Sequence, residues 1–177
     1  MPTCDPVILT PAAGVIRRLN PKSVLDIGVG LGKWGLLTRE YTDVWHHQRF
    51  YQKEWQTVLH GIEVHEEYKN PVWDVYNRVY RGNALDIIHQ LYHYYDLTIM
   101  IDVLEHFKKQ DGFDLIHRIL LRSKHLLISY SNCEQKDVRD NPYEDHISKW
   151  SSDDFPPSSE RLAYGQKGDW GLFLLSQ

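Results

Sequence analysis

The sequence predicts a doubly wound α/β fold with a mostly parallel sheet and an antiparallel hairpin at its C-terminal edge. A short apolar run, residues 24–27, passes into a glycine-rich turn and then a helical pattern, which is typical of a buried parallel strand and its following helix. Apolar runs at residues 58–63 and 97–101 alternate with helical patterns, which favours parallel strands joined by crossovers. Residues 161–164 and 170–175 flank a turn and predict the closing hairpin.

Length and composition are those of an ordinary globular protein. The chain has 177 residues, 42% of them hydrophobic and 25% charged, which predicts one domain, residues 1–177. The formal net charge of −4 offers no basic field for nucleic acid. Cys4 and Cys133 are too few for a disulfide framework or a zinc site. We expect a cytoplasmic protein without membrane contact, because neither a signal-peptide pattern nor a membrane-spanning run is seen.

The turn after the first strand is the strongest single feature of the sequence. Gly28, Gly30 and Gly32 stand at alternate positions, where glycine permits unusual backbone angles and lets a ligand approach bare N–H groups. Residues 30–35 also match a dinucleotide-binding pattern, but that register would carry the strand through Gly28, a poor strand-interior residue. In the earlier register Asp26 ends the strand, and its carboxylate would repel a pyrophosphate and attract a cationic ligand.

Candidate ligand contacts also follow the next predicted strands. They are Glu63 and Val64 after the second strand, Asn83 and Ala84 after the third, and Asp102 and Val103 after the fourth. The carboxyl ends of the strands form the ligand-binding edge of an open α/β sheet. Glu63 in particular is expected to accept hydrogen bonds from both ribose hydroxyls of a nucleoside.

Terminal patterns predict the first helix and a short capped turn. Residues 7–19 predict an opening helix, with Thr10 as N-cap and Pro11 at its first position. Near the other end, residues 151–154 form a capping box flanked by aromatic residues. The prolines at 156–157 are expected to cut that helix short.

Two histidine-containing segments are ambiguous. The aromatic loop at residues 42–56 predicts either a lid or acceptor-binding wall, or a loop pinned to the core by its aromatic side chains. His89 and His93 stand four apart on a predicted helix and would share a face. No third ligand accompanies them, so we expect no metal site.

Three stretches resemble one known protein family. Residues 26–32, with hydrophobic residues around Asp26, resemble motif I of the class I S-adenosylmethionine-dependent methyltransferases. Residues 102–107, Asp-Val-Leu-Glu-His-Phe, are similar to motif IV of the small-molecule members, including those acting in quinone biosynthesis. Residues 141–150 resemble the Asn-Pro-Tyr-Glu-x-His-x-Ser-x-Trp segment of an uncharacterised bacterial branch of this superfamily. The matches run from residue 24 to about residue 155.

The resemblance implies a Rossmann-like domain that binds S-adenosylmethionine, whose sulfonium and ammonium groups suit an acidic pocket. The cofactor contacts it implies are Asp26, Gly28, Gly30, Gly32, Glu63, Val64, Asn83, Ala84, Asp102 and Val103. The family pattern has an acid at the position of Asn83, so this chain would contact the adenine amino group without a charge. His106 and His146 are the candidate general bases, and Tyr143 is a candidate for holding the acceptor.

The sequence therefore predicts methyl transfer to a small-molecule or saccharide acceptor. Nucleic acid is disfavoured because the net charge is negative and residues 102–105 lack the Asn/Asp-Pro-Pro-aromatic motif of amino-directed DNA methyltransferases. Two alternatives stay open: a non-catalytic S-adenosylmethionine-binding subunit or regulator and, third, an NAD-dependent oxidoreductase. The acceptor, the methylated atom and the oligomeric state also stay open.

Overall fold

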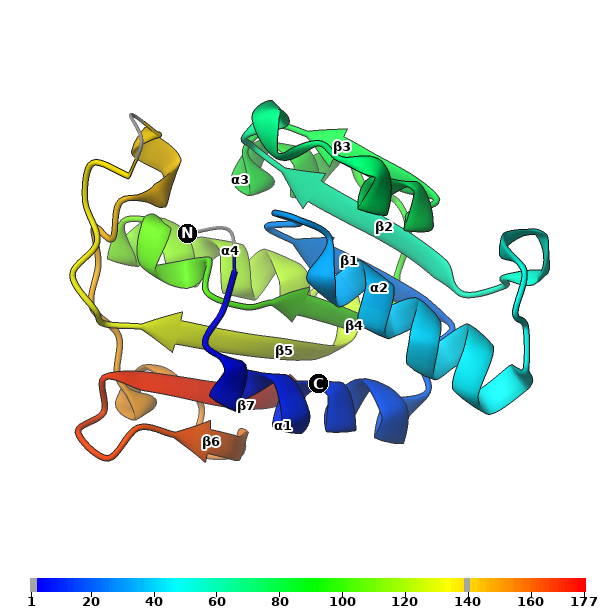
Figure 1. Cartoon of the computed structure of the whole chain (residues 1–177). Coiled ribbons are helices and arrows are strands. Elements are labelled where there is room, and N and C mark those ends of the chain that lie inside the picture. Colours follow the sequence, from blue (N-terminus) through cyan, green and yellow to red (C-terminus); the bar gives the residue numbers. More distant parts are fainter. Residues whose placement is uncertain (1–2, 139–140) are drawn as a thin grey trace.

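The computed structural model describes residues 3–138 and 141–177, which form a seven-stranded sheet flanked by helices (Figure 1). The strands are β1 (Ser23–Ile27), β2 (Val58–Glu63), β3 (Arg78–Arg81), β4 (Tyr95–Met100), β5 (Ser123–Ser131), β6 (Glu160–Tyr164) and β7 (Trp170–Ser176). They are arranged in the order β3-β2-β1-β4-β5-β7-β6. Strands β1 to β5 are parallel, whereas β7 is antiparallel to both β5 and β6. The predicted mostly parallel sheet with an antiparallel C-terminal hairpin is confirmed.

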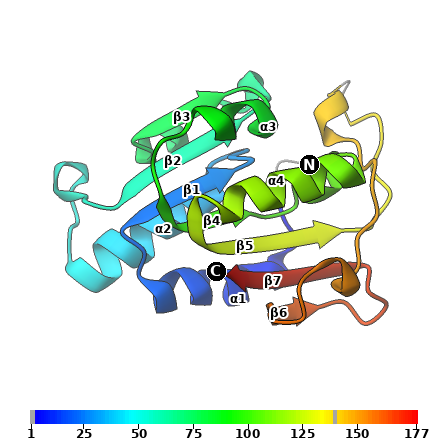
Figure 2. The ribbon, with the colours of Figure 1, turned by 180° about the vertical axis from the view of Figure 1, so that it is seen from behind.

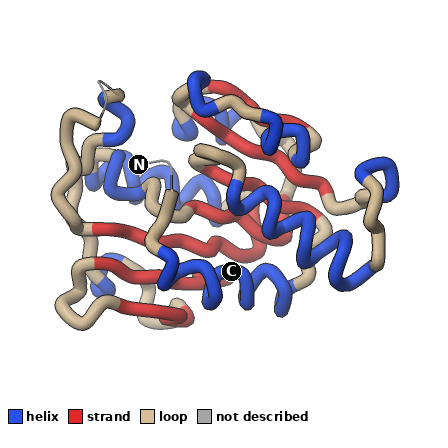
Figure 3. Tube along the Cα trace, viewed as in Figure 1, coloured by secondary structure: helices blue, strands red, loops and turns tan. Residues whose placement is uncertain are grey.

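Helices cover both faces of this sheet. Helices α1 (Pro6–Leu19) and α2 (Lys33–Arg39) lie on one face, and α3 (Ala84–Ile87) and α4 (Lys109–Leu120) lie on the other (Figures 1 and 2). Helix α2 continues directly into a π-helical segment, Glu40–Trp45. Loops gather at the two ends of the strands (Figure 3). Within the described parts of the chain, no helix is long and apolar enough to cross a lipid bilayer.

Alternation along β1 separates two hydrophobic cores. Leu25 and Ile27 belong to the core beneath α3 and α4, whereas Val24 belongs to the core beneath α1 and α2. Asp26 shares the face of Val24, because successive side chains of a strand point to opposite faces. Its carboxyl group is therefore carried under α2, where it is completely buried.

The opening helix begins earlier than the sequence predicts. Its N-cap is Asp5, whose carboxylate accepts a 2.9 Å hydrogen bond from the backbone N–H two residues on, and Pro6 lies in the first turn. Thr10 is therefore not the N-cap, and Pro11 lies inside the helix. Both prolines fit a helix start by sequence pattern alone. The earlier start is the one that extends the helix over the core, where Ile8 is buried.

The predicted capping box near the C-terminus is confirmed. Ser151 and Asp154 cap a single 3-10 turn. Trp150 and Phe155 are buried on either side of it, as expected for a hydrophobic staple. The prolines at 156–157 follow at once, and the chain turns into β6 instead of continuing as a helix.

Candidate active site

A cavity of about 300 Å³ lies at the carboxyl ends of the parallel strands, within the size range of small-molecule sites. The predicted site residues that line it are Gly28, Gly30, Glu63, Val64, Asn83, Ala84, Asp102, Val103, His106 and Tyr143. Asp26, Gly32 and His146 are not among the lining residues. The cavity lies where the strand order reverses between β1 and β4, which is the position at which open α/β sheets bind ligands.

The glycine turn after β1 forms one wall of the cavity. Gly28 and Gly30 have φ values of +79° and +50°, a left-handed backbone that glycine adopts without penalty. A Cβ on Gly28 would lie 2.4 Å from Cγ2 of Val103. The N–H of Gly28 donates a 2.9 Å hydrogen bond to the carbonyl of Ile62. The turn is thereby held against both β2 and the segment that follows β4.

Asp26 lies beneath this turn and outside the cavity wall. The hydroxyl of Tyr76 donates to Oδ2 of Asp26 at 2.5 Å and accepts from the N–H of Gly35 at 3.0 Å. A Cβ on Gly35 would lie 2.2 Å from the ring of Tyr76, so this glycine permits the close approach of α2 and Tyr76. Burial raises the pKa of Asp26 to about 7, although the hydrogen bond from Tyr76 acts in the opposite direction. The hydroxyl of Tyr76 thus links the Asp26 carboxyl group in β1 to the backbone of α2.

We expect Asp26→Asn to make the free energy of unfolding less dependent on pH. A carboxyl group whose pKa rises on folding contributes stability fully below its unfolded pKa of about 3.9, and that contribution is lost as the pH rises toward 7. The variant should therefore gain stability relative to wild type between about pH 4 and pH 7, by at most ~4 kcal/mol. Urea unfolding at several pH values measures this difference. A difference that stays constant across the range would contradict the assignment.

Gly32 also turns away from the cavity. Its φ is +89°, and an added Cβ would lie 2.8 Å from the side chain of Val72. Val72 belongs to the 3-10 turn Pro71–Val75. Gly32 therefore serves the packing of this turn against the start of α2.

Glu63 lies in the cavity wall at the end of β2. Its side chain is 5% exposed. One carboxylate oxygen accepts a 2.7 Å hydrogen bond from the N–H of Gly30, and the other accepts a 2.9 Å bond from the N–H of His65. Burial raises the pKa of Glu63, and these backbone hydrogen bonds oppose that change. Because a carboxylate has about four acceptor positions, Glu63 keeps acceptor capacity for a ligand.

Asn83 caps a helix, which the sequence did not reveal. Its side-chain oxygen accepts a 2.9 Å hydrogen bond from the N–H of Leu85 and thereby caps α3. An amide oxygen has two lone pairs, so one acceptor position remains on the cavity side. Ala84 and Leu85 continue this wall.

Asp102 carries the most strained backbone of the site. It is a non-glycine residue with φ of +52°, a conformation that costs about 1–3 kcal/mol and is frequent at functional sites. The hydroxyl of Ser129 donates to its carboxylate at 2.5 Å. Burial raises the pKa of Asp102, whereas Ser129 and the nearby Lys33 act in the opposite direction. The carboxylate is therefore held in a fixed position in the wall.

His106 and His146 lie edge to face, with ring centroids 4.9 Å apart. Nδ1 of His106 lies 3.0 Å from the carbonyl oxygen of Asp145. Because a carbonyl only accepts, Nδ1 carries the proton and Nε2 keeps the lone pair. Nδ1 of His146 is fixed in the same way by the carbonyl of Cys133 at 2.8 Å. Burial lowers the pKa of both imidazoles, so both are neutral bases at pH 7. Only His106 lines the cavity.

The segment 141–147, which we call the strap, contributes Asn141, Pro142, Tyr143, Glu144 and Ile147 to the cavity wall. The hydroxyl of Tyr68, in the loop after β2, donates to Oε1 of Glu144 at 2.5 Å and accepts from Asn141 at 3.0 Å. These bonds join the strap to the opposite side of the cavity. Beyond the strap, the indole N–H of Trp150 donates to Ser148 at 2.7 Å. Several polar residues of the 141–150 motif therefore make hydrogen bonds that fix the position of the strap and of the segment after it.

Sequence reasoning missed Tyr68 and Lys33, both of which line the cavity. Tyr68 gives no local signal, because its partners in the strap lie 73 and 76 positions further along the chain. Lys33 directly follows the glycine turn. That position in the sequence could have identified it as a residue of the cavity wall.

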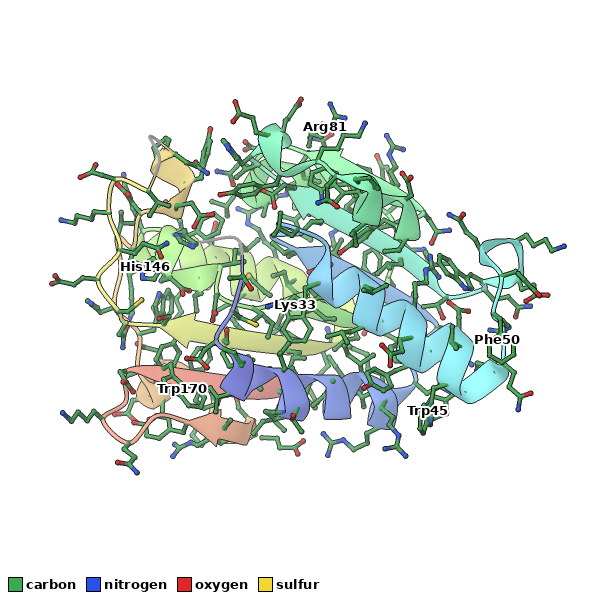
Figure 4. The ribbon with its side chains drawn as sticks, viewed as in Figure 1. Lys33, Trp45, Phe50, Arg81, His146 and Trp170 are labelled. Carbon is green, nitrogen blue, oxygen red and sulfur yellow. The ribbon has the colours of Figure 1, made fainter. Side chains whose placement is uncertain are left out.

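The aromatic loop at residues 42–56 is neither a lid nor an acceptor wall. Its first part continues α2 as a helix. Trp45 and Phe50 lie at the end of the molecule opposite His146 (Figure 4), and they are 60% and 64% exposed. A loop that follows a helix and precedes a strand lies at the amino ends of the strands, so it cannot reach the ligand-binding edge.

His89 and His93 contact different residues. His89 contacts the guanidinium of Arg118, whereas the ring of His93 packs against Tyr95 at a centroid distance of 4.7 Å. Among residues 3–138 and 141–177, no group of three or more His, Cys, Asp or Glu side chains is placed to hold a metal ion.

The strand order, the antiparallel β7 between β5 and β6, and the cavity at the switch point are those of the class I S-adenosylmethionine-dependent methyltransferase fold. No family model and no curated protein matches the chain. Solved structures of methyltransferases do match it, all at low sequence identity. The likeness is one of fold.

Three of these structures illustrate the likeness. An O-methyltransferase family protein from Burkholderia thailandensis has a TM-score of 0.61 and 13% identity, covering 96% of this chain and 56% of its own. The N-terminal domain of EvdMO1, solved in the presence of S-adenosylhomocysteine and D-fucose, has a TM-score of 0.63 and 13% identity, covering 93% and 80%. PigF with S-adenosylhomocysteine has a TM-score of 0.58 and 12% identity, covering 97% and 56%. The chain thus spans little more than half the length of the first and third.

Proposed function

We propose that this chain is an S-adenosylmethionine-dependent methyltransferase that acts as one domain, residues 1–177, on a small-molecule or saccharide acceptor. The observation that carries the proposal is the convergence of Glu63, Asn83, Asp102 and His106 on one cavity beside the glycine turn. Nucleoside-accepting groups, an acidic site for a cation and a neutral base thereby face the same space. The structures solved with S-adenosylhomocysteine support the same cofactor for this fold.

The polar residues of the cavity wall, taken in chain order, suit successive parts of S-adenosylmethionine. The remaining acceptor capacity of Glu63 suits the ribose hydroxyls, and Asn83 suits the adenine amino group. The partly buried carboxylate of Asp102 suits the positively charged methionyl end. When bound, S-adenosylmethionine supplies a methyl group on a sulfonium, which is already a good leaving group.

The protein's main contribution is to align the acceptor with that methyl group. Alignment of two reactants can remove ~7–11 kcal/mol of barrier. His106 holds a lone pair on Nε2 and removes a proton from an acceptor that must ionise. Tyr143 lies on the strap, lines the cavity and is 51% exposed, so it is available to contact the acceptor. His146 packs against His106 and holds its ring in place.

The acceptor side of the cavity favours a small molecule. Phe107, Pro142 and Ile147 add apolar surface around His106 and Tyr143. The net charge of −4 gives no general attraction for a polyanion. The D-fucose present with EvdMO1 supports a saccharide as one candidate class.

Incubation with S-adenosylmethionine carrying a labelled methyl group tests the proposal. The acceptor panel should contain phenols, amines, carboxylates and free or nucleotide-linked sugars, and formation of S-adenosylhomocysteine is the readout. Turnover with one class supports the enzyme. Tight binding of S-adenosylhomocysteine without turnover would favour a non-catalytic subunit, and preferential binding of NADH would overturn the cofactor assignment.

Glu63→Gln should weaken binding of S-adenosylhomocysteine about tenfold or more, since hydrogen bonds to a charged acceptor contribute ~1.5–3 kcal/mol. Gln keeps the size of the side chain and one acceptor oxygen for the turn. Isothermal titration with S-adenosylhomocysteine and its 2′-deoxy analogue isolates the ribose contact. Wild type should lose more affinity than the variant when the 2′-hydroxyl is removed, and an equal loss in both proteins would refute the ribose role.

A further inference from the structure

Three aromatic side chains between α2 and β2 have no part in the proposed active site. Trp45, at the end of the π-helical segment, and Phe50 and Tyr51, in the loop after it, are each more than half exposed. This loop projects past the amino ends of the strands, at the end of the molecule opposite the cavity (Figures 1 and 4). Single exposed rings are ordinary, but several on one projecting segment indicate a contact surface.

Polar groups that point inward hold this loop in place. The buried carboxylate of Asp43 forms ion pairs with Arg39 at 2.9 Å and with Arg49 at 3.2 Å. It also accepts a 2.8 Å hydrogen bond from the N–H of Gln56. The indole N–H of Trp55 donates to the carbonyl of Arg49 at 3.2 Å. The loop therefore pairs these polar groups inside and presents aromatic rings outside, which reverses the usual distribution of polar and apolar side chains.

Unpaired cations flank the exposed rings. The guanidinium of Arg17 lies 5.2 Å from the ring centroid of Trp45, and the ammonium of Lys53 lies 5.9 Å from that of Tyr51. The ammonium of Lys22 lies 3.3 Å from a histidine ring of the loop. Among residues 3–138 and 141–177, these three cations form no ion pair with a carboxylate. We call the three rings and the three cations the aromatic tip.

Charge and shape indicate what the aromatic tip contacts. The chain has a net charge of −4, and the cavity wall at the opposite end contains four carboxyl groups and two lysines. An anionic surface therefore attracts the tip more than the rest of the molecule and favours one orientation. Trp and Tyr beside Lys and Arg are typical of the interfacial layer of an anionic bilayer. A nucleic-acid strand would instead require a groove that follows its backbone, whereas these rings lie on a projecting loop (Figure 1).

We propose that the aromatic tip is a peripheral membrane-binding surface for anionic lipids. The rings enter the interfacial layer, while Arg17, Lys22 and Lys53 contact the charged headgroups. The cavity then faces away from the bilayer, so its ligands enter from water. The expectation of no membrane contact rested on the lack of a spanning segment, which a peripheral surface does not need. This contact is separate from methyl transfer and does not depend on it.

Co-sedimentation with lipid vesicles tests the proposal. Wild type should bind phosphatidylcholine vesicles that contain about 30% phosphatidylserine, and about 0.5 M salt should remove most of this binding. It should bind pure phosphatidylcholine vesicles about tenfold or more weakly. The double variant Lys22→Gln, Lys53→Gln should bind the anionic vesicles about 25-fold more weakly, because each cation near the surface contributes about fivefold. Phe50→Ser should weaken binding about tenfold or more through the loss of its buried ring.

Two exposed residues outside the tip provide matched controls. Tyr92 is 97% exposed in the loop before β4, and Lys167 is exposed in the turn between β6 and β7. Tyr92→Ser and Lys167→Gln should bind anionic vesicles as wild type does. All the variants should keep the thermal unfolding midpoint of wild type, because the side chains that they change are exposed.

Failure of wild type to bind anionic vesicles would overturn the proposal. This holds even if the tip instead binds a thymidine oligonucleotide or mediates self-association in analytical ultracentrifugation. Equal binding to neutral and anionic vesicles would also overturn it, as would tip variants that bind like the two controls. The methyltransferase assignment is tested separately by titration with S-adenosylhomocysteine, so each conclusion can fail without the other.

Discussion

Gly30→Val is expected to eliminate binding of S-adenosylhomocysteine, with a loss of affinity of ~100-fold or more, or ~2.7 kcal/mol. Gly30 lines the cavity with φ of +50°. A branched side chain there occupies the space through which a nucleoside approaches the turn. The backbone of Gly30 is held by Glu63 at 2.7 Å and by the indole of Trp73 at 2.8 Å, so the fold should survive a strain of ~1–2 kcal/mol. Titration calorimetry and thermal unfolding measure the two effects.

Gly14→Ala is the matched control for this substitution. Gly14 lies on the exposed side of α1, and an added Cβ there meets no atom within 4 Å. This variant should bind S-adenosylhomocysteine normally and gain ~0.5–1 kcal/mol in stability from its better helix propensity. If Gly30→Val is folded and binds as tightly as wild type, the cofactor does not lie against the turn. Gly30→Ala, which adds less bulk, keeps the test valid if the valine variant fails to fold.

His106→Gln should lower turnover by ~10²–10⁴-fold with a smaller change in the Kd for S-adenosylhomocysteine, the range typical of a general base. Nδ1 of His106 is fixed as the protonated nitrogen by the carbonyl of Asp145, which leaves Nε2 to accept a proton. Gln can keep a donor to that carbonyl, but it cannot take up a proton. Steady-state kinetics with the acceptor found in the panel, together with titration calorimetry, measure both quantities.

The pH dependence gives a second readout of the same prediction. Burial lowers the pKa of His106 below the ordinary value of about 6.5. Protonation at low pH removes the lone pair, so wild-type turnover should stay level down to about pH 6.5 and fall below it. The slower variant should lose this acid limb. His146→Gln is the control, because His146 is outside the cavity wall and its loss should cost less. Equal turnover of His106→Gln and wild type would remove His106 from the mechanism.

Local patterns were sufficient for the parts of this protein that are local in the chain. The strand-turn-helix unit around Gly28, the strand ending at Glu63 and the C-terminal hairpin were all predicted, because each is determined by neighbours within a few residues. The meeting of Glu63, Asn83 and Asp102 at one cavity was also predictable. It follows from the rule that parallel strands present their carboxyl ends along one edge.

Only the tertiary structure decided which of these side chains reach the cavity and which distant segments complete its wall. Asp26 lies in the predicted strand, one residue before its end at Ile27. The alternation of the strand and the packing of Tyr76 place its carboxyl group under α2. The join between Tyr68 and the strap depends on contacts across more than 70 positions, for which a single sequence contains no signal. Sequence thus determined where the cavity lies, because the position of the cavity depends on strand order and local turns. Side-chain packing between distant segments determined which residues line the cavity, because burial depends on neighbours that only folding brings together.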